Sequence, residues 1–154
     1  MYGITEKEAR NHDYNGDMQF MPVELARQIY KKDYWDVNNC DAIAAISEDV
    51  AFFVFDTGIN MGVATAAKML QTVINLFNYN QKKFADLIVD CNIGGKTIAA
   101  IRTIFECGDK AYLPKTLEIA KGARYIDICK NNSTQEVFFR GWINRCNLTF
   151  IKKI

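Results

Sequence analysis

Two polar residues follow the most continuously apolar stretch of the chain. Residues 50–55 read Val-Ala-Phe-Phe-Val-Phe, and Asp56 and Asn60 come shortly after them. Because these two residues are four positions apart, a helix places both side chains on one face. A carboxylate and an amide at the end of a buried helix need hydrogen-bonding partners. Protein groups or a bound ligand could supply them, so this helix end is a candidate binding site.

Three aromatic residues close the preceding helical segment and form a second candidate site. They are Tyr30, Tyr34 and Trp35. Aromatic rings offer broad apolar faces on which the apolar face of a sugar can stack. Packing against the next helix is the better explanation for Tyr30, whereas Tyr34 and Trp35 at the helix end stay open to either role.

Other patterns that carry chemistry elsewhere are incomplete in this chain. Gly94-Gly95-Lys96-Thr97 ends like a phosphate-binding loop, but Asp90 stands where that loop needs its first glycine. We interpret it as a turn that starts a helix. The five cysteines form no Cys-x-x-Cys pair, and the single histidine, His12, lies far from all of them. We therefore expect reduced thiols, no metal site and no cofactor.

Length and charge further narrow the classes of protein that fit this sequence. The 154 residues suffice for a real core, and no uncharged run is long enough to span a membrane. The first residues lack the pattern of a secretory signal, so we expect a cytoplasmic protein. Residues 1–60 hold 5 basic and 11 acidic residues, a balance of −6, whereas residues 61–154 hold 14 and 7, a balance of +7. Two solvated faces explain this asymmetry, as does a basic surface for an anionic polymer, either cell wall or nucleic acid.

The periodicity of apolar residues predicts a mainly α fold. Thr5-x-x-Glu8 and Ser133-x-x-Glu136 have the capping-box pattern of helix starts, and Ser47 is a plausible cap for a central helix over about residues 48–60. That helix is apolar almost all round, which predicts burial on every side. At most a short β remnant is expected at the N-terminus.

Taken in order, the motifs of the chain resemble glycoside hydrolase family 108, the lysozyme-like muramidases. The resemblance covers nearly the whole chain. It rests on Tyr2-Gly3-Ile4-Thr5, Ala26-x-x-Ile29-Tyr30-x-x-Asp33-Tyr34-Trp35-Asp36, Phe55-Asp56-x-x-Ile59-Asn60-x-Gly62, Ala67-x-x-Leu70-Gln71, Asp90-x-x-Ile93-Gly94-x-Lys96-Thr97, Arg124-Tyr125 and Phe139-x-Gly141-Trp142-x-Asn144-Arg145.

The resemblance implies a lysozyme-like protein that targets the glycan strands of peptidoglycan. Residues 1–50 would be the C-terminal part of the glycoside hydrolase segment. Residues 51–150 would be a predicted peptidoglycan-binding helical domain, in one compact unit with the former. The substrate-binding residues that it implies are Tyr34, Trp35, Asp56, Asn60, Trp142 and Arg145.

One family feature has no counterpart here. Family members carry a Glu-Gly-Gly-Tyr motif before the Tyr-Gly-Ile-Thr segment, and its glutamate is the expected general acid. This chain begins at Met1-Tyr2, so the catalytic residues are unknown and we expect a truncated, inactive muramidase. A phage- or prophage-encoded endolysin that reaches the wall after release would fit this description.

A second class of function is a helical nucleic-acid-binding or regulatory module. It would use the basic C-terminal half, where the last helix offers Arg140, Asn144 and Arg145. Beside the resemblance to muramidases, we regard nucleic acid as the weaker alternative.

Overall fold

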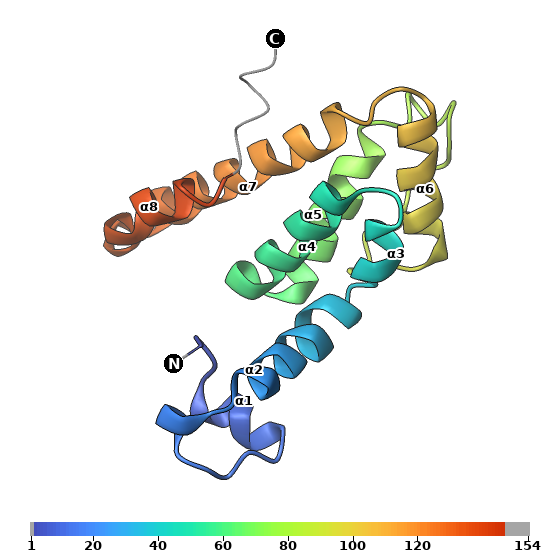
Figure 1. Cartoon of the computed structure of the whole chain (residues 1–154). Helices are drawn as coiled ribbons and strands as arrows, with labels where there is room; N and C mark the ends of the chain where they lie inside the picture. Colours follow the sequence, from blue (N-terminus) through green and yellow to red (C-terminus); the bar gives the residue numbers. More distant parts are fainter. Residues whose placement is uncertain (1, 147–154) are drawn as a thin grey trace.

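The computed structural model describes residues 2–146, and these residues fold into helices with no β-strand (Figure 1). The mainly α prediction is therefore confirmed, and residues 2–4 precede the first helix as irregular chain. In chain order the elements are α1 (Glu6–Asn11), the 3-10 turn η1 (Met18–Phe20), α2 (Val23–Tyr30), the π-helix η2 (Lys31–Asp36), α3 (Cys40–Ala44), α4 (Glu48–Met61), α5 (Val63–Asn75), α6 (Gly95–Glu106), α7 (Tyr112–Asn131), the 3-10 turn η3 (Ser133–Gln135) and α8 (Glu136–Ile143).

The N-terminal elements form a small lobe with a core of its own. The predicted capping box starts α1, since the Thr5 side chain accepts from the Glu8 backbone N–H and the Glu8 carboxylate accepts from the Thr5 N–H. The buried members of this core are Ile4, Ala9, Met21, Ala26 and Ile29. In Figure 1 this lobe, drawn in blue, lies at one end of the molecule, and α2 leads from it to the central helices.

Helices α4 and α5 form the centre of the larger core. Ser47 caps α4 through a bond from the Val50 N–H, as predicted. Gly62, with a φ of +94°, makes the corner between α4 and α5, a conformation that favours glycine. Helices α3, α5 and α7 and the π-helix η2 all pack against α4.

The prediction that α4 is buried on every side is wrong for one face. Phe53 is 1% exposed and Val54 is fully buried, but Phe52 is 60% exposed and Phe55 is half-buried. The neighbouring helices cover the other sides of α4 and leave the Phe52 side open. An apolar run in the sequence does not show which of its residues another element will cover.

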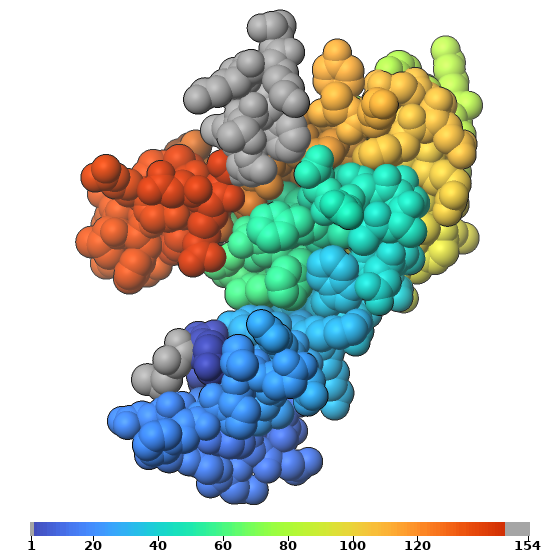
Figure 2. All heavy atoms as spheres, in the orientation of Figure 1, coloured from blue at the N-terminus to red at the C-terminus, as the bar shows by residue number. Residues whose placement is uncertain are grey.

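The C-terminal helices form an arm beside the central pair. Helix α7 packs on α4 and α5, and α8 folds back along α7 (Figures 1 and 2). The expected capping box at Ser133–Glu136 does not form. Instead the Asn132 side chain accepts from the Thr134 N–H and starts η3, and α8 begins at Glu136 without a side-chain cap. None of the described helices is long and apolar enough to span a membrane.

The buried face of α4 should dominate stability. We expect Phe53→Ala to lower the free energy of unfolding by about 3–5 kcal/mol, because it leaves a cavity in the core. Phe52→Ala, on the open face of the same helix, should cost less than about 1 kcal/mol. Urea denaturation of both variants measures the difference, and equal losses would contradict this arrangement of the core.

Candidate functional site

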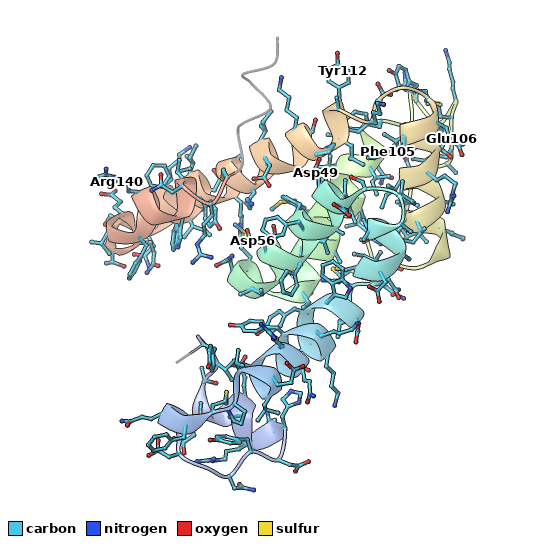
Figure 3. The ribbon with its side chains drawn as sticks, viewed as in Figure 1. Asp49, Asp56, Phe105, Glu106, Tyr112 and Arg140 are labelled. Atoms are coloured by element: carbon cyan, nitrogen blue, oxygen red, sulfur yellow. The ribbon has the colours of Figure 1, made fainter. Side chains whose placement is uncertain are left out.

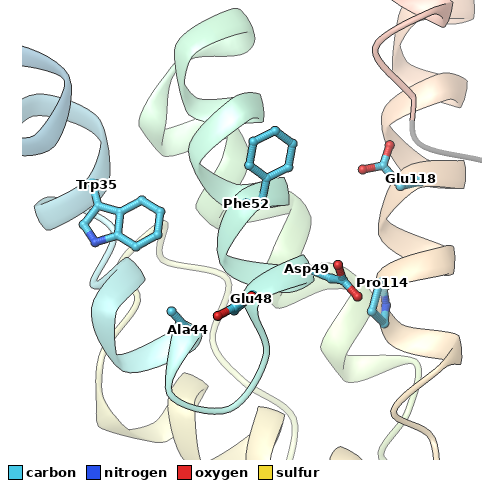
Figure 4. A pocket seen from close by; sticks show the side chains of 7 residues that line it. All are labelled: Trp35, Ala44, Glu48, Asp49, Phe52, Pro114 and Glu118. Carbon is cyan, nitrogen blue, oxygen red and sulfur yellow. The ribbon is translucent and has the colours of Figure 1, made fainter. Parts of the chain in front are cut away.

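Two hollows lie along the open face of α4, and Trp35 lines both of them. One hollow, of about 590 Å³, is bounded by Arg27, Tyr30, Lys31, Trp35, Asp41, Phe55 and Ile59. The other, of about 530 Å³, is bounded by Trp35, Ala44, Glu48, Asp49, Phe52, Pro114 and Glu118 (Figure 4). Together they form what we call the α4 groove, which follows the helix from Glu48 to Ile59.

The π-helix positions Trp35 beside this groove. The wider turn of a π-helix is rare and occurs often at functional sites. Here it spans Lys31–Asp36 and carries Trp35 next to α4, where the indole meets the Phe55 ring edge-on with the centroids 5.5 Å apart. The indole N–H donates to the Asp41 carboxylate over 2.7 Å. Packing and hydrogen bonding therefore hold Trp35 in place.

The second hollow combines an exposed ring with acidic groups. Phe52 lies between Trp35 on one side and Glu118 on the other (Figure 4). Glu48 and Asp49 are exposed in the first turn of α4, where carboxylates suit the positive end of the helix dipole. Such carboxylates can also accept hydrogen bonds from the hydroxyl groups of a ligand.

A buried lysine joins α7 to α4 behind the groove. Lys121 is 1% exposed, and its ammonium contacts Asp56 at 3.2 Å and Glu118 at 2.9 Å. It also donates to the backbone carbonyl of Arg145. We call Lys121, Asp56 and Glu118 the Lys121 cluster (Asp56 is labelled in Figure 3). Because Glu118 also lines the groove, this cluster ties the groove wall to the centre of the fold.

Asp56, Asn60 and Arg145 are brought together at the end of α4. The Asn60 side-chain N–H donates to the Asp56 backbone carbonyl and carboxylate, and its carbonyl accepts from the Arg145 guanidinium. Asn60 and Arg145 are exposed. Protein groups therefore supply partners for the helix end, and its accessible side chains border the open face of α4.

Tyr34, on η2, does not itself line the groove, although its ring lies 5.7 Å from that of Tyr30, which does. Its hydroxyl donates to Glu8. Burial is the largest cause that raises the pKa of Tyr34, and this hydrogen bond raises it further. The backbone N–H of Thr5 lowers the pKa of Glu8, so this carboxyl stays ionised and is a poor proton donor. Nearby, His12, at the C-terminal cap of α1, contacts Asp33 at 2.6 Å.

Trp142 lies in the α7–α8 arm. Its ring stacks on Tyr125 at 5.2 Å and on Phe138 at 5.9 Å, so packing within the arm accounts for its position. Burial raises the pKa of Tyr125 to about 12, which keeps its hydroxyl neutral. The structure thus separates Trp142 from Trp35, although the resemblance placed both in one set of binding residues.

The remaining sequence features have structural roles. Gly94 caps α6, so the Gly94–Thr97 segment is a turn with a helix start, as interpreted. All five cysteines are free. Among the described residues, no group of three or more His, Cys, Asp or Glu side chains is placed to hold a metal ion.

Sequence reasoning missed Phe52 and the Lys121 cluster. Phe52 gave no signal, because it sits within an apolar run. Lys121 did give one: Leu113, Leu117 and Tyr125 are buried on the same face of α7 at four-residue spacing, and Lys121 interrupts them. A lysine in such a stripe needs a buried carboxylate, and Asp56 was the candidate in the opposing helix.

The Lys121 cluster should be a main determinant of how α7 packs on α4. We expect Lys121→Met to lower the free energy of unfolding by about 3 kcal/mol, because two carboxylates lose their buried cation. Lys31→Met, which removes a cation from exposed pairs with Asp36 and Asp41, should change it little. Thermal and urea denaturation provide the comparison. A Lys121→Met protein as stable as the parent would show that the cluster does not hold the helices together.

Two family matches agree with the architecture. Residues 65–147, more than half of the chain, match the family described as Predicted Peptidoglycan domain, and residues 1–62 match Glycosyl hydrolase 108. No curated protein matches the chain. The matches favour a peptidoglycan-targeting protein and give no support to the nucleic-acid alternative. The chain therefore belongs to the glycosyl hydrolase 108 family of lysozyme-like proteins and carries a peptidoglycan-binding domain.

Proposed function

We propose that the α4 groove binds the glycan strands of peptidoglycan, with Trp35 as the central stacking surface. The observation that carries this proposal is the position of Trp35 between two hollows on an uncovered apolar face of the central helix. Exposed apolar surface that is gathered in a hollow and rimmed by polar groups is a common feature of binding sites. The family matches make peptidoglycan the ligand to consider.

The chemistry of the groove suits a chain of sugars. From Glu48 to Ile59 the helix rises about 16 Å, which is more than one sugar unit in length. The Trp35, Phe52 and Phe55 rings offer apolar surface for sugar faces, while Glu48 and Asp49 offer acceptors for hydroxyl groups. Mixed apolar and polar lining of this kind is usual for small-molecule and oligosaccharide sites.

The polar end of α4 extends the proposed site. Asn60 follows the last groove residue, Ile59, and its exposed amide lies with the Arg145 guanidinium. In our proposal these groups, with Asp56 behind them, contact amide or acidic substituents of a strand that continues past the groove. Tyr34 and Trp142 were also implied by the resemblance as substrate-binding residues, and for them this role stays a prediction. We leave them out of the proposed site because Tyr34 bonds to Glu8 and Trp142 stacks within the α7–α8 arm.

Sedimentation with purified, insoluble peptidoglycan tests the proposal. Phe52→Ala removes an exposed ring from the groove and should weaken binding about tenfold, because lost stacking is worth about 0.5–1.5 kcal/mol beyond lost area. Trp35→Ala should weaken it at least as much, with helical circular dichroism to verify folding. Tyr112→Ala removes an equally exposed ring that lies outside the groove and is the matched control.

Binding that survives both groove variants, or falls equally in the Tyr112→Ala control, would contradict a glycan site on α4.

A further inference from the structure

A separate groove lies between α5 and α7, within the part of the chain that matches the peptidoglycan domain. It has a volume of about 340 Å³ and is lined by Thr65, Lys68, Met69, Thr72, Val73, Ala120 and Arg124. We call it the α5–α7 groove. It opens on a face of α7 different from the one that carries Pro114 and Glu118, so α7 separates it from the α4 groove.

Two cations face this groove from opposite helices. Lys68 on α5 and Arg124 on α7 are both exposed, and neither has an ion pair among the described residues. The lining contains no carboxylate. Two like charges that share a hollow without a counter-charge repel one another, and a bound anion relieves that repulsion.

The rest of the lining adds hydrogen-bond donors above an apolar floor. Thr65 and Thr72 flank Lys68 on the same face of α5, three residues before it and four after it. Met69, Val73 and Ala120 supply apolar surface between the two helices. A guanidinium, an ammonium and two hydroxyls can together bind a carboxylate, while the floor accommodates a small aliphatic side chain.

We propose that the α5–α7 groove binds a free carboxylate of the peptides that cross-link the glycan strands. The inference rests on the proposed function only in taking peptidoglycan as the ligand. The position of the groove favours this source of anion, because all its residues lie within the region 65–147 that matches the peptidoglycan domain. In this arrangement α7 contacts sugar on one face and peptide on another.

Titration with defined soluble fragments tests this assignment. The probe is a muropeptide, one disaccharide with its peptide, used once with free peptide carboxylates and once with those groups amidated. We expect the full chain to bind the free form about tenfold more tightly than the amidated form, because charged hydrogen bonds are lost on amidation. The double variant Lys68→Gln/Arg124→Gln should bind both forms with equal, weak affinity.

The matched control removes the same charge elsewhere. Arg102→Gln/Lys130→Gln neutralises two exposed cations outside the groove and should keep the preference for the free form. Exchanging the groove cations, in Lys68→Arg/Arg124→Lys, should preserve most of it. If the Arg102→Gln/Lys130→Gln control loses the preference for the free form to the same extent, the effect is one of general charge and the site is overturned. A Lys68→Gln/Arg124→Gln variant that keeps the preference would also overturn it.

Competition with a phosphate compound tests which anion the groove binds, and a variant of the α4 groove separates the two proposals. Glycerol phosphate that competes with the muropeptide at lower concentration than acetate would overturn the assignment to a carboxylate. Phe52→Ala should weaken both muropeptide forms equally and leave their ratio unchanged. If the parent chain prefers the free form but the α4 variants have no effect on binding, the α4 site alone is contradicted. If the parent chain binds the free and amidated forms equally, the α5–α7 site alone is contradicted.

Discussion

A buried charge, the ammonium of Lys121, joins α7 to α4 beside the apolar contacts of Leu113 and Leu117. Removing an ammonium from water is costly unless carboxylates and carbonyls replace its hydration. Asp56, Glu118 and the Arg145 carbonyl do so here, and the Phe53 ring lies 5.3 Å from the ammonium. Because its partners come from α4, from α7 and from the chain after α8, the cation fixes the C-terminal helices against the central one. The same cluster places Glu118 at the wall of the α4 groove.

The α4 groove exists because the central helix has more apolar surface than its neighbours cover. Helices α3, α5 and α7 pack around α4, yet the ring of Phe52 stays open beside Trp35. Exposed apolar surface next to a fixed aromatic ring costs free energy in the unbound protein, and a ligand that covers it recovers that cost. The binding of peptidoglycan glycan, as we propose it, would account for the otherwise unfavourable exposure of Phe52 in a chain with a peptidoglycan-binding domain.

The sequence predicted the helices well and their contacts poorly. Local signals placed the starts of α1 and α4, since Thr5, Glu8 and Ser47 act on backbone groups within three residues of them. The second capping box failed because Asn132, one residue earlier, competes for the same role. The pairing of Asn60 with Arg145 spans 85 residues, and no local pattern encodes such a contact. The exposure of Phe52 likewise depends on where other helices end, whereas Lys121 broke an apolar stripe and was detectable in principle.

The two tryptophans allow a direct measurement of the central claim, which is that sugar binds on the open face of α4. Trp35 lines the groove and Trp142 is stacked within the α7–α8 arm, so their indole N–H signals in an NMR spectrum report separate places. On titration with a soluble, peptide-free fragment of the wall glycan, we expect the Trp35 indole signal to shift in a saturable way while that of Trp142 stays in place. A saturable shift of Trp142 alone, or no shift of Trp35 at saturating glycan, would contradict that claim.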